Sequence, residues 1–401
     1  MTGVQTCALP ISEAFAWLGQ DADFEREWQA ALEMLPEERQ SVAWNRRGKV
    51  LRTVVCNLRA SLAAYRRAWE LLPAAAPQPL RVDILLGTAA TEALAGDPVR
   101  AAALLDEVTS LVTDPDDTIV AEMANAELSS LCRLGRFTEC EAVAERGGSA
   151  AQRAGLPDIA YSIWILSACA LSGIGNLTGA LRAADAAVAA TRGMTVIEVP
   201  CLAARAFVLS RLGRHDEALS AAAEQLAKAE RMDSATAAAL ARHDAGLISL
   251  AAGRYVEAAQ LLADALAEAA EIKEINRPAA RLARAEALAR SGRPEEAARE
   301  VRRAALEPVR GGDLPWALVP LMARVQGLIA LARGDRIQAR RRLNEAAAGW
   351  RRHLQHNPGA ELQANFIDLG RPPIIGLVEP EWELRRLAAE LAELDQGREV
   401  S

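Results

Sequence analysis

The sequence predicts an all-α fold, a right-handed superhelical solenoid of eight to nine antiparallel helix pairs with a C-terminal capping helix. Composition is the first observation behind this prediction: the chain is 51% hydrophobic but has only 3 Tyr and 5 Phe, so the strong helix formers Ala and Leu supply most of the core. The second observation is internal repetition, because a short glycine-containing junction returns about every 40 residues. Together they indicate stacked helical hairpins.

Seven glycines define the turns of the repeat: Gly96, Gly135, Gly175, Gly213, Gly253, Gly292 and Gly334. They are separated by 39, 40, 38, 40, 39 and 42 residues. A small residue stands five positions after each one: Ala101, Cys140, Ala180, Ala218, Ala258, Ala297 and Ala339. Seven positions before the glycine the residue is usually small as well: Ala89, Ala168, Ala206, Gly246, Ala285 and Gly327, with Leu128 the exception. Small side chains at both places let two helices approach closely, and the glycine supplies the left-handed backbone that ends the first helix.

Two less regular units precede the seven. The triplet Cys56-Asn57-Leu58 aligns with Gly175-Asn176-Leu177 and indicates an eighth unit. Gly19 and the segment after it indicate a ninth, whose first helix is missing. In its place, residues 1–11 match the translation of a common sequencing adapter. We therefore expect them to be an assembly artefact, and the native reading frame to continue upstream.

The repeat array is expected to span residues 12–353. A Pro/Gly-rich connection follows over residues 354–379, and residues 380–396 read as an amphipathic capping helix. Its apolar face would carry Trp382, Leu384, Leu387, Leu391 and Leu394. Near the middle of the chain, the uncharged stretch 159–181 is long enough to span a bilayer. Because glycines and polar residues interrupt it in the register of a repeat turn, a buried hairpin is the stronger interpretation.

Charge and motifs argue against several classes of function. A net charge of −7 disfavours a protein whose main task is to bind nucleic acid or anionic lipid. Residues 293–353 nevertheless contain 13 Arg against 7 Asp and Glu, either as a basic patch or as ordinary solvated helix faces. His353 and His356 lack further ligands at metal-site spacing, so an exposed helix end is the better interpretation. We predict no catalytic residue, cofactor or metal, and the five cysteines after Cys7 suit reduced thiols in the cytoplasm.

The spacing of the small residues and glycines, and phrases such as LGRHDEAL and AGRYVEAA, resemble the tetratricopeptide repeat over residues 13–350. The period is longer than in that family, and the family's aromatic positions are mostly Leu or Ala. Long, Ala-rich units of this kind are similar to the superhelical sensor region of large ATP-dependent LuxR-type bacterial transcriptional regulators. In those proteins the array lies between an ATPase module and a DNA-binding domain.

The resemblance implies a non-catalytic module that binds a protein, a peptide or a small effector in a concave groove lined by first helices. The alternative is a free-standing scaffold or adaptor. Four side chains at first-helix positions are the candidate contacts: Tyr161, Trp164, His243 and Trp316. For Trp164, packing between hairpins is an equally good interpretation. Trp316 is the strongest candidate, since it follows an insertion containing Gly311 and Gly312.

Overall fold

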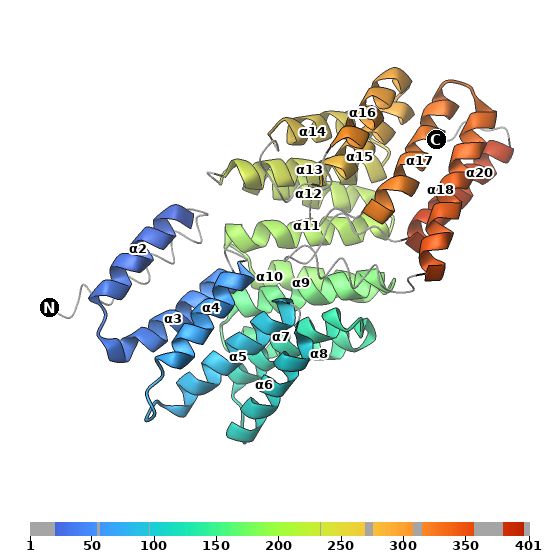
Figure 1. Ribbon diagram of the computed structural model, residues 1–401. Helices are drawn as coiled ribbons and strands as arrows, with labels where there is room; N and C mark the ends of the chain where they lie inside the picture. The colour runs from blue at the N-terminus through green and yellow to red at the C-terminus, as the bar shows by residue number, and fades with distance from the viewer. Residues whose placement is uncertain are drawn as a thin grey trace. The chain divides into compact units, whose positions relative to one another are not determined.

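The computed structural model describes residues 21–53, 57–95, 97–232, 234–268, 276–307, 315–356 and 380–396. These ranges are helical and contain no β-strand (Figure 1). They divide into two compact units, unit 1 up to Cys201 and unit 2 from Leu202, and the boundary lies inside helix α11 (Thr195–Arg211). None of the described helices combines the length and apolar character needed to cross a bilayer.

Unit 1 consists of helical hairpins that follow the single helix α2 (Asp21–Met34). The hairpins are α3 (Glu37–Thr53) with α4 (Leu58–Glu70), α5 (Gln78–Ala95) with α6 (Pro98–Leu111), α7 (Asp117–Arg133) with α8 (Cys140–Arg153), and α9 (Pro157–Gly173) with α10 (Leu177–Ala190). The short 3-10 helix η1 (Phe137–Glu139) opens α8. The two helices of each hairpin pack together, and successive first helices α3, α5, α7 and α9 also contact one another.

Unit 2 continues the same alternation of first and second helices. After α11 come α12 (His215–Ala229), α13 (Ala235–Ala251), α14 (Tyr255–Glu268), α15 (Arg277–Arg290), α16 (Pro294–Leu306), α17 (Pro315–Ala332), α18 (Arg336–His356) and α20 (Pro380–Asp395). Within unit 2, α13 packs on α14, α15 on α16, and α17 on α18. The prediction of a helical repeat solenoid is confirmed.

The hairpin turns are Schellman motifs. Six turn glycines have φ between 71° and 81°: Gly135, Gly175, Gly213, Gly253, Gly292 and Gly334. The residue after each glycine donates its backbone N–H to the carbonyl five positions earlier, as Arg214 does to Leu209 at 2.9 Å. Gly96 lies outside the described residues, but Asp97 makes the equivalent bond to Glu92. Because only glycine adopts this φ without strain, these six positions fix where each first helix ends.

The small-residue columns are where the two helices of a hairpin meet. All seven residues five positions after the glycine are completely buried, from Ala101 to Ala339. A Cβ atom on Gly246 would lie 2.8 Å from Cγ of Leu262, and one on Gly327 would lie 3.0 Å from Leu343. The helices are therefore too close for larger side chains at these places.

The uncharged stretch 159–181 forms a hairpin, as expected, with α9 and α10 on either side of Gly175. The C-terminal helix α20 packs on the last hairpin. Leu387 lies in a buried cluster with residues of α17 and α18 that includes Trp350, and Leu394 packs with Ala330 and Ala339. Residues 1–11, Cys56 and the side chain of Trp316 lie outside what the structure describes.

Candidate binding surfaces

Polar and charged side chains gather on the first helices of unit 1. We call them the first-helix polar cluster: Asn45, Lys49 and Arg52 on α3, Asp83 on α5, Glu122 and Asn125 on α7, and Asp158 and Ser162 on α9. They are linked across the helices. Lys49 Nζ lies 3.2 Å from Oε1 of Glu122 and 3.6 Å from Oδ2 of Asp158. A single side chain on α3 therefore reaches both α7 and α9.

Two hydrogen bonds extend the cluster on either side of Lys49. Asn45 Nδ2 donates to a carboxylate oxygen of Asp83, and Ser162 Oγ lies 2.8 Å from Oδ1 of Asn125. Each bond joins consecutive first helices, α3 to α5 and α7 to α9. The cluster thus forms one polar band over four hairpins.

Arg52 is buried within this band without adequate partners. Only 4% of the residue is exposed, and its nearest carboxylate oxygen is Oε2 of Glu122, 3.6 Å from Nη2. Tyr65 lies beside it and interacts with the guanidinium, but among the described residues no hydrogen bond of normal geometry reaches any of the three guanidinium nitrogens. Oε2 of Glu122 and Nδ2 of Asn125 are also buried without hydrogen-bond partners among the described residues. Since buried polar atoms are normally hydrogen-bonded, this concentration marks a specialised part of the fold.

Burial and neighbouring charge shift several pKa values in the cluster. Burial, with a further contribution from Glu122, raises the pKa of Asp83 above its ordinary value. Burial alone would lower the pKa of Lys49, but Glu122 and Asp158 outweigh it and raise that pKa. Burial also raises the pKa of Tyr65 to about 12. Lys49 is therefore a firmly charged donor, and Tyr65 a neutral phenol at pH 7.

Glycines make room for Tyr65 next to the cluster. A Cβ atom on Gly87 would lie 2.4 Å from the Tyr65 ring, and one on Gly48 would lie 2.9 Å from it. The ring is 2% exposed. These two first helices, α3 and α5, thus close over a tyrosine on α4.

Of the candidate contacts named from the sequence, two fall in unit 1. Tyr161 and Trp164 both lie on α9 and are half-buried. The indole of Trp164 packs against Gly148 of the preceding helix α8, where a Cβ atom would come within 2.2 Å of the ring. This contact favours a packing role between hairpins for Trp164.

The third candidate, His243, is half-buried on α13. Its Nδ1 lies 3.2 Å from Oδ1 of Asp244, whose other carboxylate oxygen accepts a 2.8 Å hydrogen bond from Gln225 of α12. His353, expected at an exposed helix end, is half-buried. Among the described residues, no group of three or more His, Cys, Asp or Glu side chains could hold a metal ion.

The polar cluster was missed from the sequence, although a signal was present. Asp83, Glu122 and Ser162 each stand thirteen positions before a turn glycine, so they occupy one column of three successive repeats. In the next repeats the same column holds Pro200 and Leu240. A polar column confined to one end of a repeat array indicates a surface that the other repeats do not share.

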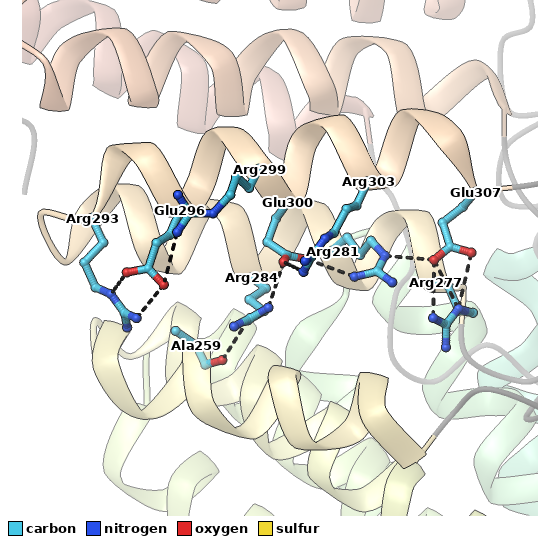
Figure 2. A network of polar contacts seen from close by, with 10 residues as sticks. All are labelled: Ala259, Arg277, Arg281, Arg284, Arg293, Glu296, Arg299, Glu300, Arg303 and Glu307. Carbon is cyan, nitrogen blue, oxygen red and sulfur yellow. Dashed lines mark hydrogen bonds and ion pairs between the residues drawn. The ribbon is translucent and has the colours of Figure 1, made fainter.

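Unit 2 has its own charged network between α15 and α16 (Figure 2). Arg281 bridges Glu300 of α16 and Glu307, the C-cap of that helix, with Nη1 3.0 Å from Glu300 and Nε 2.8 Å from Glu307. Arg277 also pairs with Glu307, and Arg284 with Glu300. Its arginines are spaced four and three residues apart on α15, so they follow one face of the helix. The network joins the two helices of one hairpin.

A second charged network in unit 2 joins α15, α17 and α20. Arg324 is 1% exposed and makes bidentate pairs with Glu286 of α15 and Glu390 of α20, at distances between 2.5 and 3.1 Å. Arg290 and Arg386 complete it, at 2.7 Å from Glu390 and 2.8 Å from Glu286. Arg324 therefore belongs to a buried ion cluster, whereas sequence reasoning placed it only in an arginine-rich region.

Comparison with known proteins identifies the fold. No protein-family model matches the chain, and no curated protein sequence matches it. The apo form of RapI is a similar solved structure, with a TM-score of 0.61 and 12% identity over 91% of this chain and 99% of that chain. A Rap protein complexed with Competence and Sporulation Factor gives a TM-score of 0.51 and 15% identity, over 90% of this chain and 100% of that one.

A third similar structure is the Signal Transduction ATPase with Numerous Domains protein with a tetratricopeptide repeat sensor from Pyrococcus horikoshii. Its TM-score is 0.56 at 14% identity, over 85% of this chain and 54% of that protein. At such identities the likeness shows the fold alone. The chain is a solenoid of the tetratricopeptide-repeat type, as its sequence predicted.

Proposed function

We propose that this chain is a non-catalytic interaction or effector-sensing module, and that the first-helix polar cluster of unit 1 is its contact surface. One observation carries the proposal: Arg52, Glu122 and Asn125 keep buried polar atoms without hydrogen bonds on a face assembled from four hairpins. A protein, peptide or small polar effector binds over this face at its accessible group, Lys49, whose side chain is 34% exposed. Binding of this kind uses shape and hydrogen bonds and needs no covalent chemistry.

We further propose that the module is the sensor part of a bacterial signalling or transcriptional regulator. Support comes from the resemblance to the sensor region of LuxR-type regulators. Two of the similar structures also belong to a signal-transduction ATPase with a repeat sensor and to a Rap protein in complex with a factor. The four described cysteines are free and buried, which suits a reducing compartment such as the cytoplasm.

Selection from a random peptide library displayed on phage tests the contact surface. We expect peptides selected on the full chain to lose at least roughly tenfold in affinity when Lys49→Ala or Asn45→Ala is introduced, as for an interface anchor. Arg67→Ala is the control, because Arg67 is an exposed residue of the second helix α4. Peptides that bind all three variants equally would place the contact surface elsewhere.

Genomic sequence distinguishes the regulator from the alternative function, a free-standing scaffold or adaptor. If the chain is part of such a regulator, the genomic sequence around its coding region should encode a phosphate-loop ATPase in the same reading frame. A stop codon in frame, with no such module, would favour the scaffold.

A further inference from the structure

The C-terminal helix α20 carries a strongly acidic, amphipathic sequence. It has five acidic and two basic side chains over Pro380–Asp395. Leu384, Leu387, Leu391 and Leu394 are spaced three, four and three residues apart, which places them along one stripe. Leu387 and Leu394 are buried at 0% and 2% exposure. This is the pattern by which an amphipathic helix binds a complementary surface.

The surface under α20 is rich in arginine. It is formed by Arg211 on α11, Glu286 and Arg290 on α15, Arg324 on α17, and Arg336 and Arg340 on α18, and we call it the α20-binding surface. Its five arginines outnumber its single carboxylate, so it is complementary to an acidic helix. Three of these arginines come from the arginine-rich region noted in the sequence.

Contacts with α20 run along its whole length. At its start, the Trp382 ring lies 5.0 Å from the Arg211 guanidinium carbon and 4.6 Å from that of Arg386. In the middle, Glu390 accepts from Arg290 and Arg324. At its end, Arg336 donates to the carbonyl of Leu394, and Arg340 pairs with Asp395. Cations therefore meet the carboxyl end of the helix, where the helix dipole favours them.

The contacts that hold α20 in place differ from those that hold a repeat helix. Repeat helices are joined in pairs by a glycine turn and packed through alanine columns, whereas α20 is held by leucines and charge pairs and has no hairpin partner among the described residues. We propose that the α20-binding surface is an acceptor site for an acidic amphipathic helix of a partner protein, and that α20 occupies it within the same chain. A partner helix with the same leucine spacing and a central glutamate displaces α20.

Opening the site by mutation tests this proposal on the full chain. A fluorescent peptide of residues 380–396 serves as the probe, and its binding is measured by anisotropy. The wild-type chain should bind it weakly, because a tethered helix competes at an effective concentration of about millimolar. Glu390→Arg and the milder Glu390→Gln should each release α20 and bind the peptide at least roughly tenfold more tightly.

Two controls make the test specific. Glu381→Arg reverses an exposed charge on the same helix and should leave the site closed. A probe peptide that itself carries Glu390→Arg should lose at least roughly tenfold in affinity for the opened chains. Circular dichroism should show that the opened chains keep nearly all their helix.

Several outcomes would overturn the proposal. One is equal peptide binding by the wild type, Glu381→Arg and both Glu390 variants. Another is cooperative unfolding of the array in Glu390→Gln, which would make α20 an integral repeat helix. A third is that the opened chains gain affinity for duplex DNA but not for the peptide. None of these outcomes bears on the phage-selected peptides, which report on unit 1.

Discussion

The first-helix polar cluster of unit 1 and the α20-binding surface of unit 2 both use first helices, to which the latter adds the second helix α18, but they differ in how their buried charges are satisfied. In unit 2, Arg324 makes bidentate pairs with Glu286 and Glu390, all within 3.1 Å. In unit 1, Arg52 has Oε2 of Glu122 at 3.6 Å and makes no hydrogen bond of normal geometry with the residues that the structure describes. Both arginines are at least 96% buried.

The difference shows what completes a polar first-helix face. In unit 2 the chain supplies its own acidic helix, and Glu390 provides the second carboxylate. In unit 1 the described residues supply no such element, and the partners must come from a ligand if the proposed function is correct. A buried charge is costly unless it is paired, so the two faces should respond differently to mutation and pH.

The largest expected effect is that of Arg324→Met. It removes the bidentate partner that Glu286 and Glu390 share and leaves them only Arg290 and Arg386, so it should lower the free energy of unfolding by about 3 kcal/mol in a denaturant titration. The double variant with Glu286→Gln removes the buried carboxylate on α15 and should recover part of the loss. A loss below about 1 kcal/mol for the single variant would contradict the paired cluster.

Acid should weaken unit 2 through Glu286. Burial would raise its pKa, but Arg324 and Arg386 outweigh burial and hold the pKa well below the ordinary value of 4.5. A carboxyl group with a lowered folded-state pKa contributes stability above pH 4.5 that is lost as the pH falls through the folded-state pKa. The stability difference between wild type and Glu286→Gln should therefore shrink as the solution is acidified.

For Asp83 of unit 1, we expect stability to depend on pH in the opposite direction. Burial and Glu122 raise its pKa, so its contribution to stability is lost as the pH rises through the folded-state value. Asp83→Asn should accordingly remove a penalty at neutral pH, measured by the same denaturant titrations. If the free energy of unfolding changed with pH in the same direction for the Glu286 and Asp83 variants, the two faces would not differ as described.

A smaller loss of stability is expected from a substitution next to Tyr65, which packs beside the polar cluster. Gly87→Ala places a Cβ atom 2.4 Å from the buried ring. Overpacking costs about 1–3 kcal/mol, more than the roughly 1 kcal/mol that alanine gains in helix propensity. Gly327→Ala in unit 2 is the matched control, because its neighbour at 3.0 Å is the flexible end of Leu343. Thermal unfolding should rank the alanine at position 87 as the more damaging.

The smallest effect should come from Arg52→Met. The guanidinium of Arg52 is buried with only a 3.6 Å ion pair to Glu122 to offset its desolvation cost, and Glu122 keeps Lys49 at 3.2 Å, so the change should stay within about 1 kcal/mol. Peptides selected on the wild type should nevertheless bind the variant less well. A loss of stability as large as that of Arg324→Met would mean that Arg52 is equally well paired.

The sequence predicted the hairpins because the interactions that define them are short. Gly213 ends α11 through bonds that lie within six residues, and Ala218 packs completely buried five residues further on. The polar cluster escaped prediction since Lys49 and Glu122 lie 73 positions apart, and no local pattern pairs them. Trp164 was ambiguous for the same reason, and its contact with Gly148 of α8 favours packing between hairpins.

By itself, the sequence determined the repeat, its turns and the amphipathic character of α20, because helix periodicity and glycine conformation are local properties. Only the tertiary structure decided which charges meet: Arg290 and Glu390, 100 positions apart, pair at 2.7 Å in unit 2, while Arg52 in unit 1 has Glu122 only at 3.6 Å. Such pairing depends on how successive hairpins stack and on where the last helix docks. The distances between these charged groups are set by packing between helices, and the sequence of a single helix does not contain that information.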